Sequence, residues 1–163
     1  MAGRNENALE QLRLKPGQTI LEIGPGPGRL LIPAAWRVLP GGRAIGIDIQ
    51  YKMIERLKER AQKAGVMNLT ALVGDATSLK LPSESVDLVL MCTVLGEIPD
   101  RPAALAECYR VLKQGGALSI TEIIGDPHYQ TRAKAQRLAA AAGFELQWIE
   151  GGWRSYTASF YKP

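Results

Sequence analysis

The feature that most constrains this chain is a regular alternation of short apolar runs with segments of helical periodicity. Apolar runs of strand length occupy 19–23, 43–48, 69–73, 86–91 and 117–123. Helical patterns occupy 29–38, 51–64, 101–112 and 130–142. A short lead-in helix is expected over 5–12, and two alternating runs at 144–150 and 154–161, joined by two glycines, predict a closing hairpin.

This order of elements predicts an α/β fold, a doubly wound parallel sheet with helices on both faces and an antiparallel hairpin at the end. The 163 residues leave room for a single domain over 1–163. In such sheets, ligands bind beyond the carboxyl ends of the strands, beside the first strand. Site residues are therefore expected in the loops that follow the strands.

Composition excludes several classes of partner. The net charge is only +4, and the lysines and arginines are scattered, so we expect no nucleic-acid partner. The longest apolar stretch, around 86–95, contains Asp87 and is too short to span a membrane, and the polar first ten residues do not resemble a secretory signal. Cys92 and Cys108 are expected to be reduced, as in a soluble cytoplasmic protein.

The loop after the first apolar run is rich in glycine. Gly24, Gly26 and Gly28 follow Glu22 in the spacing G-x-G-x-G. Such glycines let the backbone approach a ligand closely and adopt positive φ, and the helix that follows offers free N–H groups to an anion. The dinucleotide fingerprint G-x-G-x-x-G would need a glycine at Arg29, so that pattern fails. A purely structural turn is the alternative.

The next three loops carry groups that suit a nucleoside. Asp48 ends the second run and can accept hydrogen bonds from both ribose hydroxyls, or else cap the next helix, and Ile49 can lie against an adenine face. Asp75 can accept from the adenine amino group while the Ala76 N–H donates to a ring nitrogen. Cys92 directly follows the fourth run and is expected to line the site through its backbone, without acting as a nucleophile.

Together these motifs resemble the class I S-adenosylmethionine (SAM)-dependent methyltransferases, in particular the ubiquinone/menaquinone-biosynthesis type. The resemblance runs from about residue 15 to the end and includes ILEIGPGPG, IGIDI, GDATSLKLPSESVDLVL and EIPDRPAALAECYRVLKQGGALSI. It implies a Rossmann-like seven-stranded sheet of order 3-2-1-4-5-7-6 with the last strand antiparallel, SAM as cofactor and no metal. It also implies a SAM site made of Glu22, Gly24, Gly26, Gly28, Asp48, Ile49, Asp75, Ala76 and Cys92.

The activity that this resemblance implies is methyl transfer from SAM to a small-molecule acceptor. Because a sulfonium is already activated, the protein contributes mainly proximity, and a base is needed only if the acceptor must lose a proton. His128, the one histidine in the chain, and Glu97 are the candidate catalytic residues, in the loops after the fifth and fourth strands.

Two other functions stay open. One is a non-catalytic SAM- or nucleotide-binding module, or the cofactor half of a larger assembly; the other, less favoured, is an NAD-linked oxidoreductase. Only about 18 residues precede the first strand, whereas relatives often use additional residues there as a lid over the substrate. An open pocket, completion by a second subunit in a homo-oligomer, and a missing lid are the three alternatives.

Overall fold

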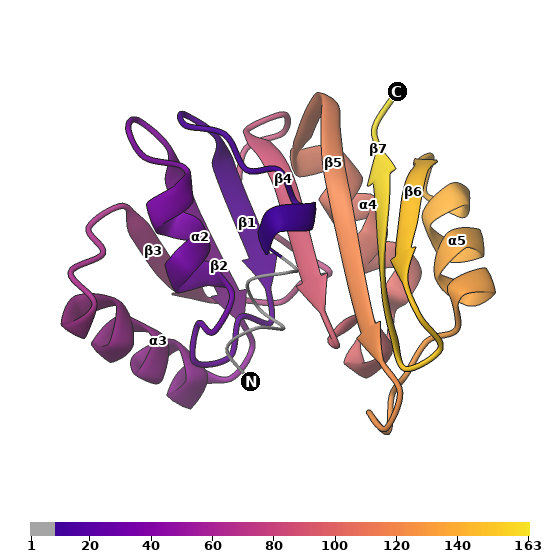
Figure 1. Cartoon of the computed structure of the whole chain (residues 1–163), viewed down its shortest axis with the longest axis horizontal. Coiled ribbons are helices and arrows are strands. Elements are labelled where there is room, and N and C mark those ends of the chain that lie inside the picture. The colour runs from indigo at the N-terminus through magenta and orange to yellow at the C-terminus, as the bar shows by residue number, and fades with distance from the viewer. Residues whose placement is uncertain (1–8) are drawn as a thin grey trace.

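A computed structural model describes residues 9–163, which build one seven-stranded sheet of order β3-β2-β1-β4-β5-β7-β6 (Figure 1). The strands are β1 (Thr19–Ile23), β2 (Arg43–Asp48), β3 (Leu69–Val73), β4 (Val86–Cys92), β5 (Leu112–Ile123), β6 (Glu145–Gly151) and β7 (Ser155–Tyr161). The helices are α2 (Leu31–Arg37), α3 (Tyr51–Lys63), α4 (Arg101–Val111) and α5 (Arg132–Ala141), with a 3-10 turn, η1 (Leu95–Glu97). The predicted fold class and strand order are confirmed.

The direction of the strands places the loops. β1 to β5 pair in parallel, and β7 pairs antiparallel with both β5 and β6. In Figure 1, β1, β4 and β5 run toward the lower edge of the sheet and β7 runs the other way. β1 is hydrogen-bonded to β2 on one side and β4 on the other, so the strand order reverses beside it. The loops after β1, β2 and β4 therefore meet at one edge.

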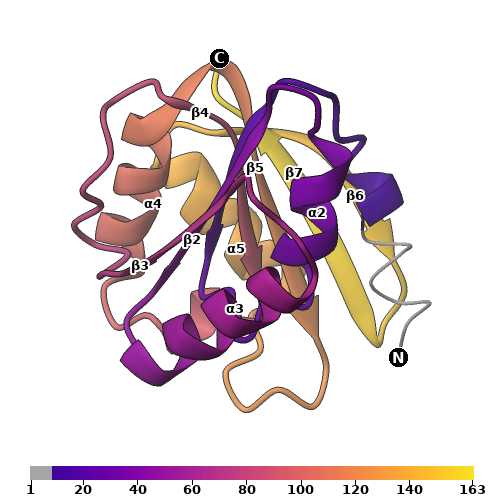
Figure 2. The same cartoon turned by 90° about the vertical axis from the view of Figure 1, so that its left-hand side faces the viewer.

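Helices cover the sheet in two layers, with α2 and α3 on one face and α4 and α5 on the other (Figures 1 and 2). The α3 stripe of Ile54, Leu57 and Ala61 packs with Ile20 of β1 in one buried cluster. All five residues of β1 are buried, as expected of a central parallel strand covered on both faces.

The start of β5 differs from the prediction of a helix through 112 and a turn over 114–116. β5 begins at Leu112, directly after α4, and Leu112 pairs with Val86 while Ala117 pairs with Leu88. The residues between them bulge out of the ladder, with Gly115 at φ +72°. Pairing with β4 draws this segment into the sheet, which the local glycine signal does not reveal.

The ends of two other predicted helices also shift. α5 begins at Arg132, not at 130, because the Thr131 hydroxyl accepts a hydrogen bond from the Lys134 N–H and caps the helix. Of the expected lead-in helix, residues 9–11 are helical, and 5–8 lie outside the described residues. The hairpin predicted at 144–150 and 154–161 is confirmed as β6 and β7.

Candidate functional site

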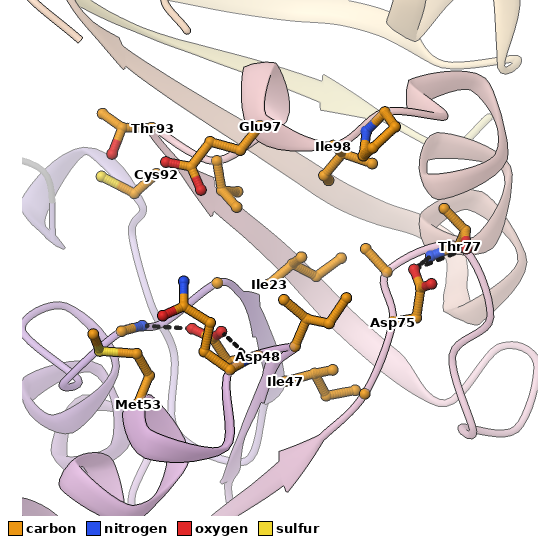
Figure 3. A pocket seen from close by; sticks show the side chains of 18 of the residues that line it. Ile23, Ile47, Asp48, Met53, Asp75, Thr77, Cys92, Thr93, Glu97 and Ile98 are labelled. Atoms are coloured by element: carbon orange, nitrogen blue, oxygen red, sulfur yellow. Dashed lines mark hydrogen bonds between the residues drawn. The ribbon is translucent and has the colours of Figure 1, made fainter. Parts of the chain in front are cut away.

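A cavity of about 590 Å³ opens at the carboxyl ends of β1, β2 and β4 (Figure 3). This volume is within the range of small-ligand sites. Its wall comes from the loops after β1 to β4 and from η1: Ile23, Gly24, Gly26, Pro27, Ile47, Asp48, Ile49, Gln50, Met53, Gly74, Asp75, Ala76, Thr77, Cys92, Thr93, Val94, Glu97, Ile98, Pro99 and Asp100. Of the nine expected cofactor residues, all but Glu22 and Gly28 belong to this wall.

The three glycines of the first loop all have positive φ, but each meets different surroundings. A Cβ on Gly24 would lie 2.5 Å from a methyl group of Val94. A Cβ on Gly28 would collide with the side chain of Leu57 on α3. At Gly26 a Cβ would meet nothing within 4 Å. Gly24 and Gly28 therefore permit close packing, and Gly26 presents bare backbone to the cavity.

Asp48, at the end of β2, is the buried carboxylate of the cavity wall, with 8% of its surface exposed. One carboxylate oxygen accepts the Gln50 N–H at 2.9 Å and the other accepts the Gly26 N–H at 3.3 Å. It thus ties the glycine loop to the start of α3. Each oxygen retains a further lone pair, so the carboxylate can also accept hydroxyl donors from the cavity.

Asp75 lies in the loop after β3 and forms a tight local turn. Its Oδ1 accepts both the N–H and the hydroxyl of Thr77, each at 2.8 Å. These bonds hold the pKa of the Asp75 carboxyl below its ordinary value. Its Oδ2 stays available to an amino donor, and Ala76 lies next to it in the wall.

Glu22 lies on β1, is 3% exposed and does not line the cavity. Burial, and to a smaller extent the charge of Asp48, raises its pKa to about 8, although the Leu31 N–H donates to it. Its Oε2 has no hydrogen-bond partner. Glu22 is therefore mostly protonated at neutral pH and lies beneath the glycine loop.

Cys92, at the end of β4, lines the cavity, and burial raises the pKa of its thiol to about 12. A thiol in that state is not a nucleophile at neutral pH. Thr93, which follows it, has φ +53° and donates its N–H to the Thr121 carbonyl at 2.8 Å. This left-handed residue turns the chain out of the sheet and into the cavity wall.

The η1 turn forms the wall opposite Asp48 and presents Glu97 to the cavity (Figure 3). Arg101 of α4 holds this turn, because its guanidinium donates to the Leu95 carbonyl at 3.2 Å and to the Gly96 carbonyl at 2.7 Å. A Cβ on Gly96 would collide with the carbonyl of His128, so η1 packs directly on the loop after β5.

His128 is exposed and is not part of the cavity wall. Its N–H is bonded to Asp126, and its carbonyl accepts the side-chain amide of Gln130. The structure thus brings Glu97, but not His128, to the cavity.

Other wall residues carried no functional signal in the sequence. Met53, at the first turn of α3, extends past the sheet edge into the cavity. Ile98 and Pro99 follow η1, an element that was not predicted. An apolar residue beyond a strand end is indistinguishable from a core residue by periodicity alone.

Two other kinds of site are absent from the described residues. Within residues 9–163, no group of three or more His, Cys, Asp or Glu side chains is placed to hold a metal ion. In the same part of the chain, no helix has the length and apolar character that a membrane crossing requires.

A family model described as "Methyltransferase domain" matches residues 21–120, more than half of the chain. Nocamycin O-methyltransferase from Saccharothrix syringae is 34% identical over 119 residues, which cover 73% of this chain and 42% of that protein. Demethylmenaquinone methyltransferase from Symbiobacterium thermophilum is 36% identical over 109 residues, covering 66% of this chain and 43% of that protein. The chain thus spans less than half the length of these curated relatives.

Among solved structures, a SAM-dependent methyltransferase from Aquifex aeolicus superposes with a TM-score of 0.91. The alignment covers 98% of this chain and 89% of that one, at 23% sequence identity. At that identity the likeness supports the fold and says nothing further about the reaction.

Proposed function

The chain belongs to the class I SAM-dependent methyltransferase family, and on that premise we propose that it transfers a methyl group from SAM to a small-molecule acceptor. The observation that carries this proposal is the cavity at the strand-order reversal, where Asp48 and the open backbone of Gly26 face the same space. The curated relatives named above act, by their names, on nocamycin and demethylmenaquinone. Both of these named acceptors are small organic molecules, which supports an acceptor of that class.

The groups of the wall fit the parts of SAM. Asp48 would accept from the ribose hydroxyls, and Asp75 with the Ala76 N–H would recognise the adenine edge. Ile49 is 70% exposed at the rim, an exposure that a stacked adenine would relieve. Gly24, Gly26 and the backbone at Cys92 would border the methionine part. Glu22 and Gly28 would support the loop from beneath.

Bound SAM supplies an electrophilic methyl group whose carbon–sulfur bond breaks as the acceptor attacks. The chain's own residues orient the two reactants and limit the access of water, which is where most of the rate enhancement of such a displacement arises. Where the acceptor still carries a proton, we propose that the Glu97 carboxylate receives it, since it faces the cavity. His128 is the second proposed base, for an acceptor that extends beyond the cavity mouth.

Calorimetry with SAM, S-adenosylhomocysteine (SAH) and NAD tests the proposal. We expect SAM and SAH to bind and NAD not to bind. Asp48→Ala should weaken SAH binding by roughly tenfold or more, because two hydroxyl donors lose a charged acceptor. Glu59→Gln on the exposed side of α3 is the matched control. Absence of SAM and SAH binding to the folded protein would reject the proposed function.

A further inference from the structure

The charged side chains of the cavity wall all have the same sign. Asp48, Asp75, Glu97 and Asp100 line it, and none of the lysines, arginines or histidine among residues 9–163 does so. This contrasts with the chain as a whole, whose net charge is +4. The cavity is therefore an acidic site within a basic protein, and its field favours a positively charged occupant.

Three of these carboxylates already have donors from the protein. Asp48 accepts two backbone N–H groups, Asp75 accepts a backbone N–H and a hydroxyl, and Asp100 caps α4 by accepting from its first turn. For Glu97, the described part of the chain supplies no hydrogen bond or ion pair to the carboxylate. Glu97 is thus the wall carboxylate whose charge the described residues leave uncompensated.

The backbone at Glu97 is nevertheless fixed. The Arg101 guanidinium binds the two carbonyls that precede it, and the Glu97 N–H itself donates to the Val94 carbonyl at 3.0 Å. In Figure 3 its side chain extends from η1 toward Cys92 and Thr93 at the end of β4. A carboxylate that extends into a cavity acts on charge in a ligand more strongly once the ligand has displaced water.

We propose that Glu97 makes this cavity selective for positive charge at the reacting centre, so that it favours the sulfonium of SAM over the neutral thioether of SAH. The proposal rests on the proposed function. Methyl transfer converts the sulfonium to a thioether, so the attraction to Glu97 is present for the donor and absent for the product. Glu97 would thereby act as a specificity-determining residue that holds SAM more tightly than SAH.

The test compares three ligands that differ in charge at this position, namely SAM, SAH and sinefungin, in which a carbon bearing a protonated amine replaces the sulfonium. Binding is measured by calorimetry with the unmodified protein, Glu97→Gln and the control Glu59→Gln, which removes the same charge from the exposed side of α3. We expect Glu97→Gln to weaken the binding of SAM and sinefungin by about tenfold and the binding of SAH by less than about twofold. The difference corresponds to the loss of one charge–charge interaction. Glu59→Gln should leave all three affinities unchanged.

Equal weakening of the binding of all three ligands would overturn the proposal, because Glu97 would then contact a part that the ligands share. Unchanged binding of all three would overturn it as well, because Glu97 would then contact none of them. Failure of every ligand to bind the unmodified protein would instead reject the proposed function. A second measurement needs no variant. Raising the salt concentration should lower the affinity for SAM relative to SAH, since salt screens charge–charge attraction, and a ratio that does not change with salt would contradict the proposal.

Discussion

At the scale of single residues, environment sets the chemistry more than residue type does. Glu22 and Asp48 are carboxyl groups on neighbouring strands, and both are almost fully buried. Asp48 accepts hydrogen bonds from two backbone N–H groups at a loop. Glu22 lies inside the sheet with one oxygen unbonded, and burial raises its pKa to about 8. The same functional group therefore serves as an acceptor at Asp48 and as a neutral packing residue at Glu22.

The Glu22 pKa predicts how stability depends on pH. The folded-state pKa of about 8 lies above the ordinary value of 4.5. The contribution of Glu22 to the free energy of unfolding is therefore complete below about pH 4.5 and is lost as the pH rises toward 8. The loss should reach several kcal/mol, at about 1.4 kcal/mol per pH unit. Glu22→Gln should remove most of this slope and be more stable than the unmodified protein at pH 8. Denaturant unfolding across this pH range checks the prediction. Parallel curves of the free energy of unfolding against pH for the two proteins would contradict it.

At the scale of elements, the turn after β4 depends on the helix that follows it. η1 has three residues and no side-chain cap of its own. α4 is capped by Asp100 and begins with Arg101, which reaches back to η1. A short 3-10 turn is weak in isolation, so its fixed geometry derives from these contacts. The geometry of the cavity wall around Glu97 therefore depends on the first turn of α4.

Arg101→Gln tests this dependence. Losing two hydrogen bonds from a charged donor should lower the melting temperature by a few degrees, equivalent to about 1–2 kcal/mol. The Glu97 amide should exchange with solvent at least severalfold faster. Arg132→Gln is the matched control, because its guanidinium binds the carbonyls of Gly151 and Gly152 at the β6–β7 turn. Equal exchange of the Glu97 amide in the two variants would show that Arg101 does not hold η1.

At the scale of the whole molecule, the last residues join elements that are distant in sequence. Lys162 is 5% exposed, and its ammonium donates to the Leu112 carbonyl at 2.8 Å. It lies 3.5 Å from a Glu84 carboxylate oxygen and 4.7 Å from the centre of the Tyr109 ring. Its backbone pairs with the bulge at the start of β5. The end of the chain thereby stabilises the α4–β5 junction.

Replacing this ammonium should destabilise the entire fold. Lys162→Met leaves the buried Leu112 carbonyl without its donor, so we expect a loss of about 2 kcal/mol in the free energy of unfolding. Lys113→Met removes the ammonium that pairs with Asp87 at 2.8 Å, but that pair is partly exposed, and the loss should be at most about 1 kcal/mol. Equilibrium unfolding in denaturant compares the two variants. Equal losses of unfolding free energy in the two variants would mean that the burial of Lys162 adds nothing to its effect on stability.

Much of the architecture was predictable because the signals are local. Apolar runs and helical stripes identified the strands and helices, and loops after successive parallel strands necessarily meet at one edge. That reasoning placed Gly26, Asp48, Asp75 and Glu97 in one region, and the structure puts all four on the cavity wall. The strand order itself rested on family resemblance, because periodicity does not specify which strands are neighbours.

What the sequence by itself determined is the succession of elements and the residue types available at each strand end. The tertiary structure alone decided which of those residues reach the cavity, the burial that keeps Glu22 neutral and the Arg101 contacts that hold Glu97. The physical reason is one of range. Backbone periodicity and turn preferences act over a few residues, whereas burial, pKa and the seating of η1 on the loop after β5 depend on contacts between segments far apart in the chain.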